Sequence, residues 1–467
     1  MASAAVLSGL TKWLSRAEWQ EPFNDLLDRH LAGPCQAAGV ALDRLADVIG
    51  DQSTAVVWGC IFEDFLSSDL DDGSNIVNDY LKRRGWKESV PNKRYMSALR
   101  SSVMTLYEVS DIVRDQSFLA RDLLRGGEPV RISEKSATHS LKPWDRLAAR
   151  VVQVGSKFEM AGGALPFSHE LAERIGEGFA ELKADARAEA LTLARERHGG
   201  AEIDQFMLDT EILRRGAFLF TNIWLGDVLE RTLDPKLPAL VNSDGDDVVW
   251  TIIRYPLKES ADRGAIEDAL TAIPAFHRAS ESHWNWIAPA SRKPQGARRA
   301  PKDTQTFVST FAAGSVNMGD VELQADALKL ETNSPQRAQK GRALLESVIG
   351  RFVGEPVVES KTTAEMAASR PADEGLLPAS GLSPEEESAI IHETLERHYR
   401  GLLDEPVPML EGVSPRRAAK TKKGREKLVV WLKLIENGNA RQKADSPMAR
   451  YDVSWMWEEL GIPHLRQ

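Results

Sequence analysis

Apolar residues recur at helical spacing in two stretches of the chain. The first reaches about Leu70, within an N-terminal region of residues 1–100, and its interruptions at Gly33–Pro34 and near Asp51–Ser53 predict two or three packed helices. The second covers residues 168–237 and is interrupted at Gly199–Gly200. Apolar positions three to four residues apart share one face of a helix, and paired glycines or a Gly-Pro step end such a pattern. We therefore predict a helical N-terminal region and, further along, a pair of helices.

Between these two stretches the apolar period changes to two. Val103, Tyr107 and Val109 fall on one face of an extended segment, and Gly126–Gly127 provides a turn. Alternation with period two between turn residues is typical of strands whose two faces differ in burial. The pattern predicts a small antiparallel β unit over residues 101–167.

Residues 238–363 alternate between strand-like and helix-like patterns. One helix should begin at Ser334–Pro335, because serine can cap the free backbone N–H groups and proline fits the first helical position. Proline, glycine and basic residues interrupt residues 292–302, which predicts a mobile basic loop. The whole segment is predicted to be an α+β sandwich with helices on one face of a mixed sheet.

A segment rich in alanine, serine and proline covers residues 364–383 and is the best candidate for a linker between domains. A helix should begin directly after it, because Ser383–Pro384 followed by Glu386 forms a capping box. Residues 384–467 are therefore predicted to form a C-terminal helical binding module. Taken together, the patterns indicate a multidomain α+β protein.

Composition narrows the functional classes only a little. The chain has 467 residues, 42% of them hydrophobic, a formal net charge of −10 and two cysteines. Two cysteines exclude a disulfide framework and favour neither a structural zinc site nor an iron–sulfur cluster. No apolar run is long enough to cross a bilayer, and the first residues do not resemble a secretory signal. We expect a cytoplasmic protein with no membrane partner.

Groups of residues that resemble metal-binding motifs do not have the spacing that such motifs require. His392 and His398 are six residues apart, whereas two zinc ligands on one helix face are four apart. The Asp-rich segments around Gly73 and Gly245 do not place glycine at the sixth position of a calcium loop and are more typical of turns. We assign no catalytic, cofactor-binding or metal-ligating residue. An enzyme with a dispersed active site in residues 101–363 stays open as an alternative.

The segment from Ser414 to Lys433 is strongly basic. It contains eight basic residues and one acidic residue, a local charge of +7 on a chain of net charge −10. Two interpretations stand about equal: a solvated helix face, or an anion-binding face. In the second case Arg416, Arg417, Lys422 and Lys423, together with the loop at 292–302, could bind the phosphates of a nucleic acid.

The same C-terminal segment carries a recognisable pattern. It resembles the toxin-binding domain at the C-terminus of Xre/MbcA/ParS-type bacterial antitoxins, and the whole chain looks like uncharacterised bacterial proteins that contain this hairpin, without the SEC-C zinc motif that some of them carry. The resemblance implies a helical hairpin that binds a protein partner, and in that family the partners are toxins that consume NAD. The matching residues are Leu410, Gly412, Ser414, Pro415, Thr421, Gly424, Leu428 and Leu432.

Three tryptophans near the C-terminus are candidate anchors for such a partner. Trp431 is predicted to lie on the flank of a helix whose core stripe contains Leu428 and Leu432, and Trp455 and Trp457 belong to the final segment. Tryptophan is mostly a core residue but is also enriched at binding hot spots. The sequence thus predicts a non-catalytic, antitoxin-like or adaptor protein that binds a protein partner, with nucleic-acid binding as the alternative.

Overall fold

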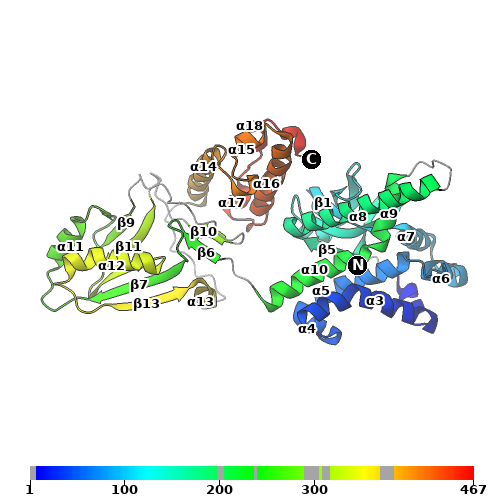
Figure 1. Cartoon of the computed structure of the whole chain (residues 1–467), viewed down its shortest axis with the longest axis horizontal. Coiled ribbons are helices and arrows are strands. Elements are labelled where there is room, and N and C mark those ends of the chain that lie inside the picture. Colours follow the sequence, from blue (N-terminus) through cyan, green and yellow to red (C-terminus); the bar gives the residue numbers. More distant parts are fainter. Residues whose placement is uncertain are drawn as a thin grey trace. The chain divides into compact units, whose positions relative to one another are not determined.

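The computed structural model describes residues 7–196, 204–235, 239–288, 304–307, 316–368 and 383–466. The chain divides into two compact units, the first made of residues 1–235 and 379–467 and the second of residues 236–378. Helices and strands both contribute, as Figure 1 shows, and the protein is of the α+β class. The second boundary falls inside the predicted linker.

The N-terminal region is helical, as predicted. Its longest helix, α3, continues through the predicted break, because Pro34 lies inside it, and ends only where Gly39 takes a left-handed conformation (φ 67°). A single proline removes one intrahelical hydrogen bond, which the packing of α3 against α10 can offset. The helices are α2 (Ser8–Leu14), α3 (Ala17–Ala38), α4 (Leu45–Ile49), α5 (Asp51–Ser67), α6 (Ile76–Arg84) and α7 (Val90–Ser101).

The β unit is a closed barrel with the strand order β1-β2-β3-β5-β4. The prediction of a wholly antiparallel unit is wrong at one pair, because β3 and β5 run parallel. Closure removes the exposed strand edges that a small open sheet would leave. The strands are β1 (Met104–Val113), β2 (Ser117–Asp122), β3 (Val130–Ser133), β4 (Arg146–Val154) and β5 (Lys157–Phe167).

Three helices follow the barrel, where two were predicted. The expected single second helix is divided at Gly216, which ends α9 and directly precedes α10. Phe179 of α8 stacks on Phe220 of α10 with a centroid distance of 5.2 Å. The helices are α8 (His169–Glu196), α9 (Gln205–Arg215) and α10 (Ala217–Leu233).

Helix α5 approaches strand β5 very closely. A Cβ atom added to Gly163 would lie 2.6 Å from Sγ and 2.7 Å from the backbone N of Cys60, so only glycine fits there. Glu63, one turn further along α5, is fully buried, and its Oε1 accepts a hydrogen bond of 3.1 Å from the Gly163 N–H. Its Oε2 has no hydrogen-bond partner among the described residues.

A buried polar network joins the same helix to the barrel and to α10. Asp64 accepts a hydrogen bond from the buried Arg150 of β4, which also donates to the Ser102 carbonyl at 2.9 Å. The second carboxylate oxygen of Asp64 lies 3.2 Å from Nε2 of His30, whose Nδ1 lies 2.6 Å from the Thr221 hydroxyl. The network compensates the buried charges, which would otherwise be costly.

The second unit contains a six-stranded sheet with the order β13-β7-β12-β11-β9-β8. All its pairs are antiparallel, which corrects the prediction of a mixed sheet, and α11 and α12 lie on one face as predicted (Figure 1). A separate pair, β6 and β10, is parallel. The bounds are β6 (Ala239–Asn242), β7 (Val249–Pro256), α11 (Arg263–Thr271), β8 (Phe276–Arg278), β9 (His283–Ile287), β10 (Thr304–Phe307), β11 (Asn317–Leu323), β12 (Ala327–Thr332), α12 (Pro335–Ile349), β13 (Val357–Thr362) and α13 (Thr363–Ala368).

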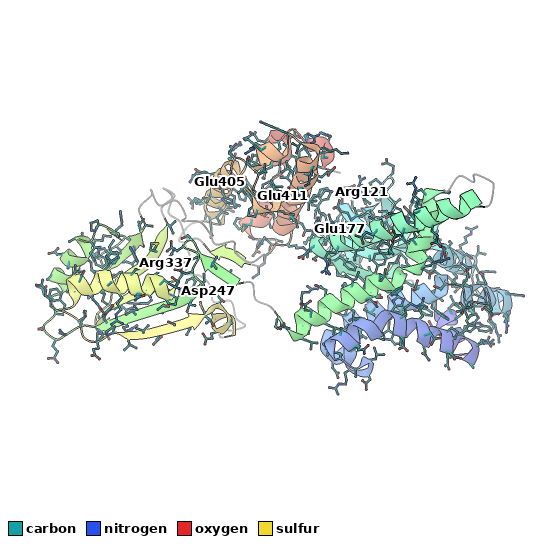
Figure 2. All side chains as sticks on the ribbon, in the orientation of Figure 1. Arg121, Glu177, Asp247, Arg337, Glu405 and Glu411 are labelled. Carbon is teal, nitrogen blue, oxygen red and sulfur yellow. The ribbon has the colours of Figure 1, made fainter. Side chains whose placement is uncertain are left out.

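The predicted start of α12 is confirmed. Ser334 is its N-cap and accepts a hydrogen bond from the Arg337 N–H, and Pro335 follows at the first helical position. Arg337 (Figure 2) is 1% exposed and donates to Asp244 and Ser243 in the turn after β6. That Asp-rich segment is a turn, as expected, because the Gly245 N–H donates to the Asn242 carbonyl and the Asp244 N–H donates to the Asn242 side chain, both at 2.9 Å.

The C-terminal module has a hydrophobic core of its own. The capping box at Ser383 and Glu386 is present as predicted. The predicted linker is shorter than expected at its N-terminal side, because α13 extends to Ala368; residues 369–382 and the predicted loop at 292–302 lie outside the described residues. The helices are α14 (Pro384–Leu402), α15 (Pro415–Ala418), α16 (Lys422–Ala440), α17 (Pro447–Arg450) and α18 (Trp455–Glu459).

The buried Glu63 makes stability depend on pH. Burial raises its pKa from 4.5 to about 7, so the folded chain holds a proton that the unfolded chain releases between these values. Stability should therefore fall by about 3 kcal/mol as the pH rises from 4.5 to 7. Glu63→Gln should be more stable than wild type at pH 8 and lose this advantage at pH 5, as measured by urea unfolding.

The matched control for this prediction is Glu173→Gln, which changes an exposed glutamate of α8. Its stability difference from wild type should be the same at both pH values. Equal pH dependence in wild type and Glu63→Gln would contradict the prediction.

Candidate functional site

The segment that carries the sequence resemblance folds into a compact turn and two helices. Glu411 and Gly412 both take left-handed conformations, with φ of 58° and 75°, and bring Val413 back to pair with Val407. Thr421 caps α16 by accepting a hydrogen bond of 3.0 Å from the Gly424 N–H. Leu428 and Leu432 face the module's core, as the sequence predicts.

Gly424 permits the close packing of α16 against α15. A Cβ atom at this position would lie 2.2 Å from the carbonyl oxygen of Ala418 and 2.6 Å from the Thr421 hydroxyl. A larger residue would push the two helices apart. This explains in steric terms why the segment has glycine one turn into a helix, where glycine is otherwise unfavourable.

A cavity of about 420 Å³ opens where the turn meets the start of α16. We call it the basic pocket. Its wall combines four cations with a single carboxylate, Glu411, labelled in Figure 2. Glu411 pairs with Lys427 at 2.5 Å and with Lys423 at 3.8 Å, and these two lysines lower its pKa. The lining residues are Leu410, Glu411, Val413, Arg417, Ala418, Lys420, Thr421, Lys423, Gly424 and Lys427.

The structure divides the four predicted basic residues into two groups. Arg417 and Lys423 line the basic pocket. Arg416 does not line it, because its guanidinium pairs with Asp404 at 3.2 Å and with Glu459 at 2.7 Å. Lys422 is exposed and also lies outside the pocket lining. The +7 segment is thus not one continuous face.

Two of the three predicted tryptophan anchors are core residues. Trp431 is 7% exposed and Trp457 is 1% exposed, and both belong to the module's hydrophobic core. The placement of Trp431 on an open flank is therefore wrong, because Trp431 belongs to the buried cluster that also contains Met456 and Trp457 of the final segment. Trp455 is half-buried, and the Arg400 guanidinium lies 4.6 Å from its ring centroid.

The middle of α16 packs against the barrel, a contact that the sequence analysis did not predict. Lys433, counted above with the basic face, is buried and pairs with Glu108 of β1. Arg146 of β4 lies 3.6 Å from the other oxygen of that carboxylate. The Lys433 ammonium also lies 4.2 Å from the Trp144 ring centroid, a cation–π geometry.

Glu436, the next residue on this docking face, links both sides. It accepts hydrogen bonds from the indole N–H of Trp144 in the barrel and, at 2.7 Å, from that of Trp457 in the module. Asn437 donates at 2.7 Å to the Pro143 carbonyl and to Asp145. The sequence carried no clear signal of this contact, because alternation places Glu108 on the face opposite Tyr107 and Val109, where an acid is expected to be exposed.

Burial shifts the pKa values of two groups at this interface. The pKa of Lys433 is lowered by burial, although Glu108 acts in the opposite direction. Burial and the nearby Arg146 lower the pKa of His169, at the start of α8, to about 4, so this imidazole is neutral at pH 7. The interface therefore joins Glu108, Arg146 and Lys433 beside an uncharged histidine.

No group of three or more potential metal ligands occurs within the part of the chain that the structure describes. His392 makes a hydrogen bond of 2.7 Å with the Pro447 carbonyl, and Asp72 accepts one from the Ser74 N–H as a turn residue does. Within the same residues, no helix combines the length and apolar character that a membrane crossing requires.

The fold and these sites define an α+β protein with a docked C-terminal helical module. A model for a family of unknown function, DUF7986, matches residues 59–194, which include most of α5, the whole barrel and most of α8. The match covers less than a third of the chain and leaves out the C-terminal module. No curated protein and no solved structure gives a significant match.

Coupling between Glu108 and Lys433 can be measured by a double-mutant cycle. Lys433→Met should cost about 3–5 kcal/mol in urea unfolding, because it leaves a buried carboxylate poorly compensated. Combining it with Glu108→Gln should recover at least about 1 kcal/mol, since the unpaired negative charge is then gone.

Arg397→Met is the control, because it removes a pair with Glu393 in which both side chains are exposed, and it should cost less than about 1 kcal/mol. If the effects of Glu108→Gln and Lys433→Met simply add, the two residues are not coupled and the docking contact is not energetically significant.

Proposed function

We propose that this chain is a non-catalytic, cytoplasmic protein-binding protein, antitoxin-like in character, whose C-terminal module binds its partner at the basic pocket. The observation that carries the proposal is the position of the pocket. It is lined by Leu410, Thr421 and Gly424, which belong to the pattern that resembles toxin-binding domains, and by cations from the same segment.

The pocket suits an acidic side chain or a chain-terminal carboxylate of a partner. Lys420 and Lys423 are exposed and Arg417 is exposed beside them, so they can pair with an incoming carboxylate. Leu410 and Val413 add apolar surface next to the charges. An anion there also lies near the N-terminus of the 19-residue helix α16, where the helix dipole favours negative charge.

Nucleic-acid binding is the second candidate, because Arg417, Lys420, Lys422 and Lys423 are all exposed near one another in the sequence. Phosphate binding of this kind has little positional specificity, since each cation contributes a similar electrostatic term. Protein binding in a pocket depends instead on which cation is changed. The two functions therefore differ in how neighbouring lysines respond to substitution.

The test compares two adjacent lysines in the full chain. Lys423→Glu changes a pocket residue, whereas Lys422→Glu is a matched charge reversal outside the pocket. Affinity purification from the native host with quantitative mass spectrometry should recover a specific partner with wild type and Lys422→Glu. Recovery with Lys423→Glu should fall about tenfold or more.

If the recovered partner slows growth or depletes NAD when expressed alone, co-expression of wild type should reverse this, and Lys423→Glu should not. Equal loss of the partner in both variants would contradict the pocket model. Equal loss accompanied by salt-sensitive binding of wild type to labelled DNA or RNA would establish the nucleic-acid alternative in its place.

A further inference from the structure

A second cavity lies between the barrel and the C-terminal module, at the opposite end of α16 from the basic pocket. Its volume is about 770 Å³, and we call it the barrel cleft. Ser110, Leu119 and Arg121 of β1 and β2 form one wall, and Asn439, at the C-terminal end of α16, contributes to the other with Tyr451. The contacts of Lys433 and Glu436 with the barrel hold the two walls together.

One polar group in this cleft lacks a partner. Asn439 is 8% exposed, and its Nδ2 has no hydrogen-bond acceptor among the described residues. A buried donor without an acceptor is costly, and such groups are rare in folded proteins.

Two non-glycine residues in the same cleft have strained backbones. Asp111 has a φ of 43° and Trp144 a φ of 69°, in the left-handed region that a tryptophan rarely adopts. Both line the cleft. Such conformations concentrate at binding sites, where surrounding contacts hold them in place. Trp144 is held by its indole hydrogen bond to Glu436 and by its backbone N–H, which donates to the Val109 carbonyl at 2.7 Å.

The charge of the cleft is opposite to that of the basic pocket. Its four carboxylates outnumber its two cations, Arg121 (Figure 2) and Arg466, although Asp111 already pairs with Arg131 and Glu436 with Arg466. Glu128 and Asp452 are exposed, and so accessible to a ligand. This excess disfavours phosphate and favours a cationic ligand. The carboxylates are Asp111, Glu128, Glu436 and Asp452.

We propose that the barrel cleft binds an extended, basic peptide segment of a partner protein. A lysine or arginine of the peptide pairs with the exposed Glu128 and Asp452. The Asn439 Nδ2 atom is enclosed in the free protein, and it donates a hydrogen bond to a main-chain carbonyl of the peptide once its side chain rotates toward the cleft. Pro129, Pro143 and the half-buried Tyr451 supply the apolar surface against which the peptide backbone lies. This site is independent of the function proposed for the basic pocket.

The experiment is a selection from a displayed library of random octapeptides on the full chain. Peptides enriched on wild type relative to Asn439→Leu should be rich in lysine and arginine. The best peptide, labelled with fluorescein, should bind wild type in an anisotropy titration and bind Asn439→Leu and Glu128→Gln at least about tenfold more weakly. Glu173→Gln, on α8, and Lys423→Glu, in the basic pocket, should bind it like wild type.

Stability provides a second readout. Asn439→Leu should leave the midpoint of thermal unfolding unchanged or raise it, because it removes an unpaired buried donor. No enrichment, enrichment of acidic peptides, or equal binding by Asn439→Leu and Glu128→Gln would overturn the proposal. So would a lowered unfolding midpoint for Asn439→Leu, which would show that the amide serves the fold. Loss of peptide binding in Lys423→Glu would place the peptide at the basic pocket instead.

Discussion

The buried carboxylate of Glu108 is the constraint on which the arrangement of the first unit depends. It lies in the barrel wall, where an uncompensated charge would be too costly to bury, and Arg146 at 3.6 Å compensates it only in part. Lys433 of the C-terminal module completes the compensation. Because an ammonium must meet this carboxylate, α16 is held against the barrel in one register, with Glu436 and Asn437 aligned on their own partners. The C-terminal module has a hydrophobic core of its own, but these contacts fix its position on the barrel.

This docking gives α16 three roles along its length. At about 1.5 Å per residue its 19 residues span roughly 28 Å. Its first turn lines the basic pocket, its middle binds the barrel, and its last turn lines the acidic barrel cleft. The order agrees with the helix dipole, since the positive end lies at the proposed anion site and the negative end at the proposed site for a basic peptide. A partner with an acidic and a basic segment could therefore contact both ends of one rigid helix.

Local signals in the sequence predicted local structure well. The capping box at Ser383 and the cap at Ser334 require only a few neighbouring residues, and both are present. Long-range contacts were not predictable in this way. Pro34 was expected to end a helix, but α3 continues through it and packs against α10. Lys433 was counted with the basic segment, as part of a solvated or an anion-binding face, whereas its partner is 325 residues away in sequence. For the candidate site, the pattern from Leu410 to Gly424 located the pocket, whereas the burial of Trp431 and Trp457 depends on how the final segment folds back.

The burial of these tryptophans changes what kind of interface the module can form. Trp431 and Trp457 are buried in the core, so the accessible groups of the basic pocket are mainly cations, with a small apolar surface beside them. The partner binding that we propose there would rely on charge pairing, which speeds association and weakens as salt is added. Salt sensitivity therefore does not separate a protein partner from a nucleic acid, as it would for an interface centred on aromatic residues. The two kinds of partner differ in which lysine matters for binding. A protein partner in the pocket should be affected by a change of Lys423 but not of Lys422, whereas nucleic-acid binding should be weakened equally by either change.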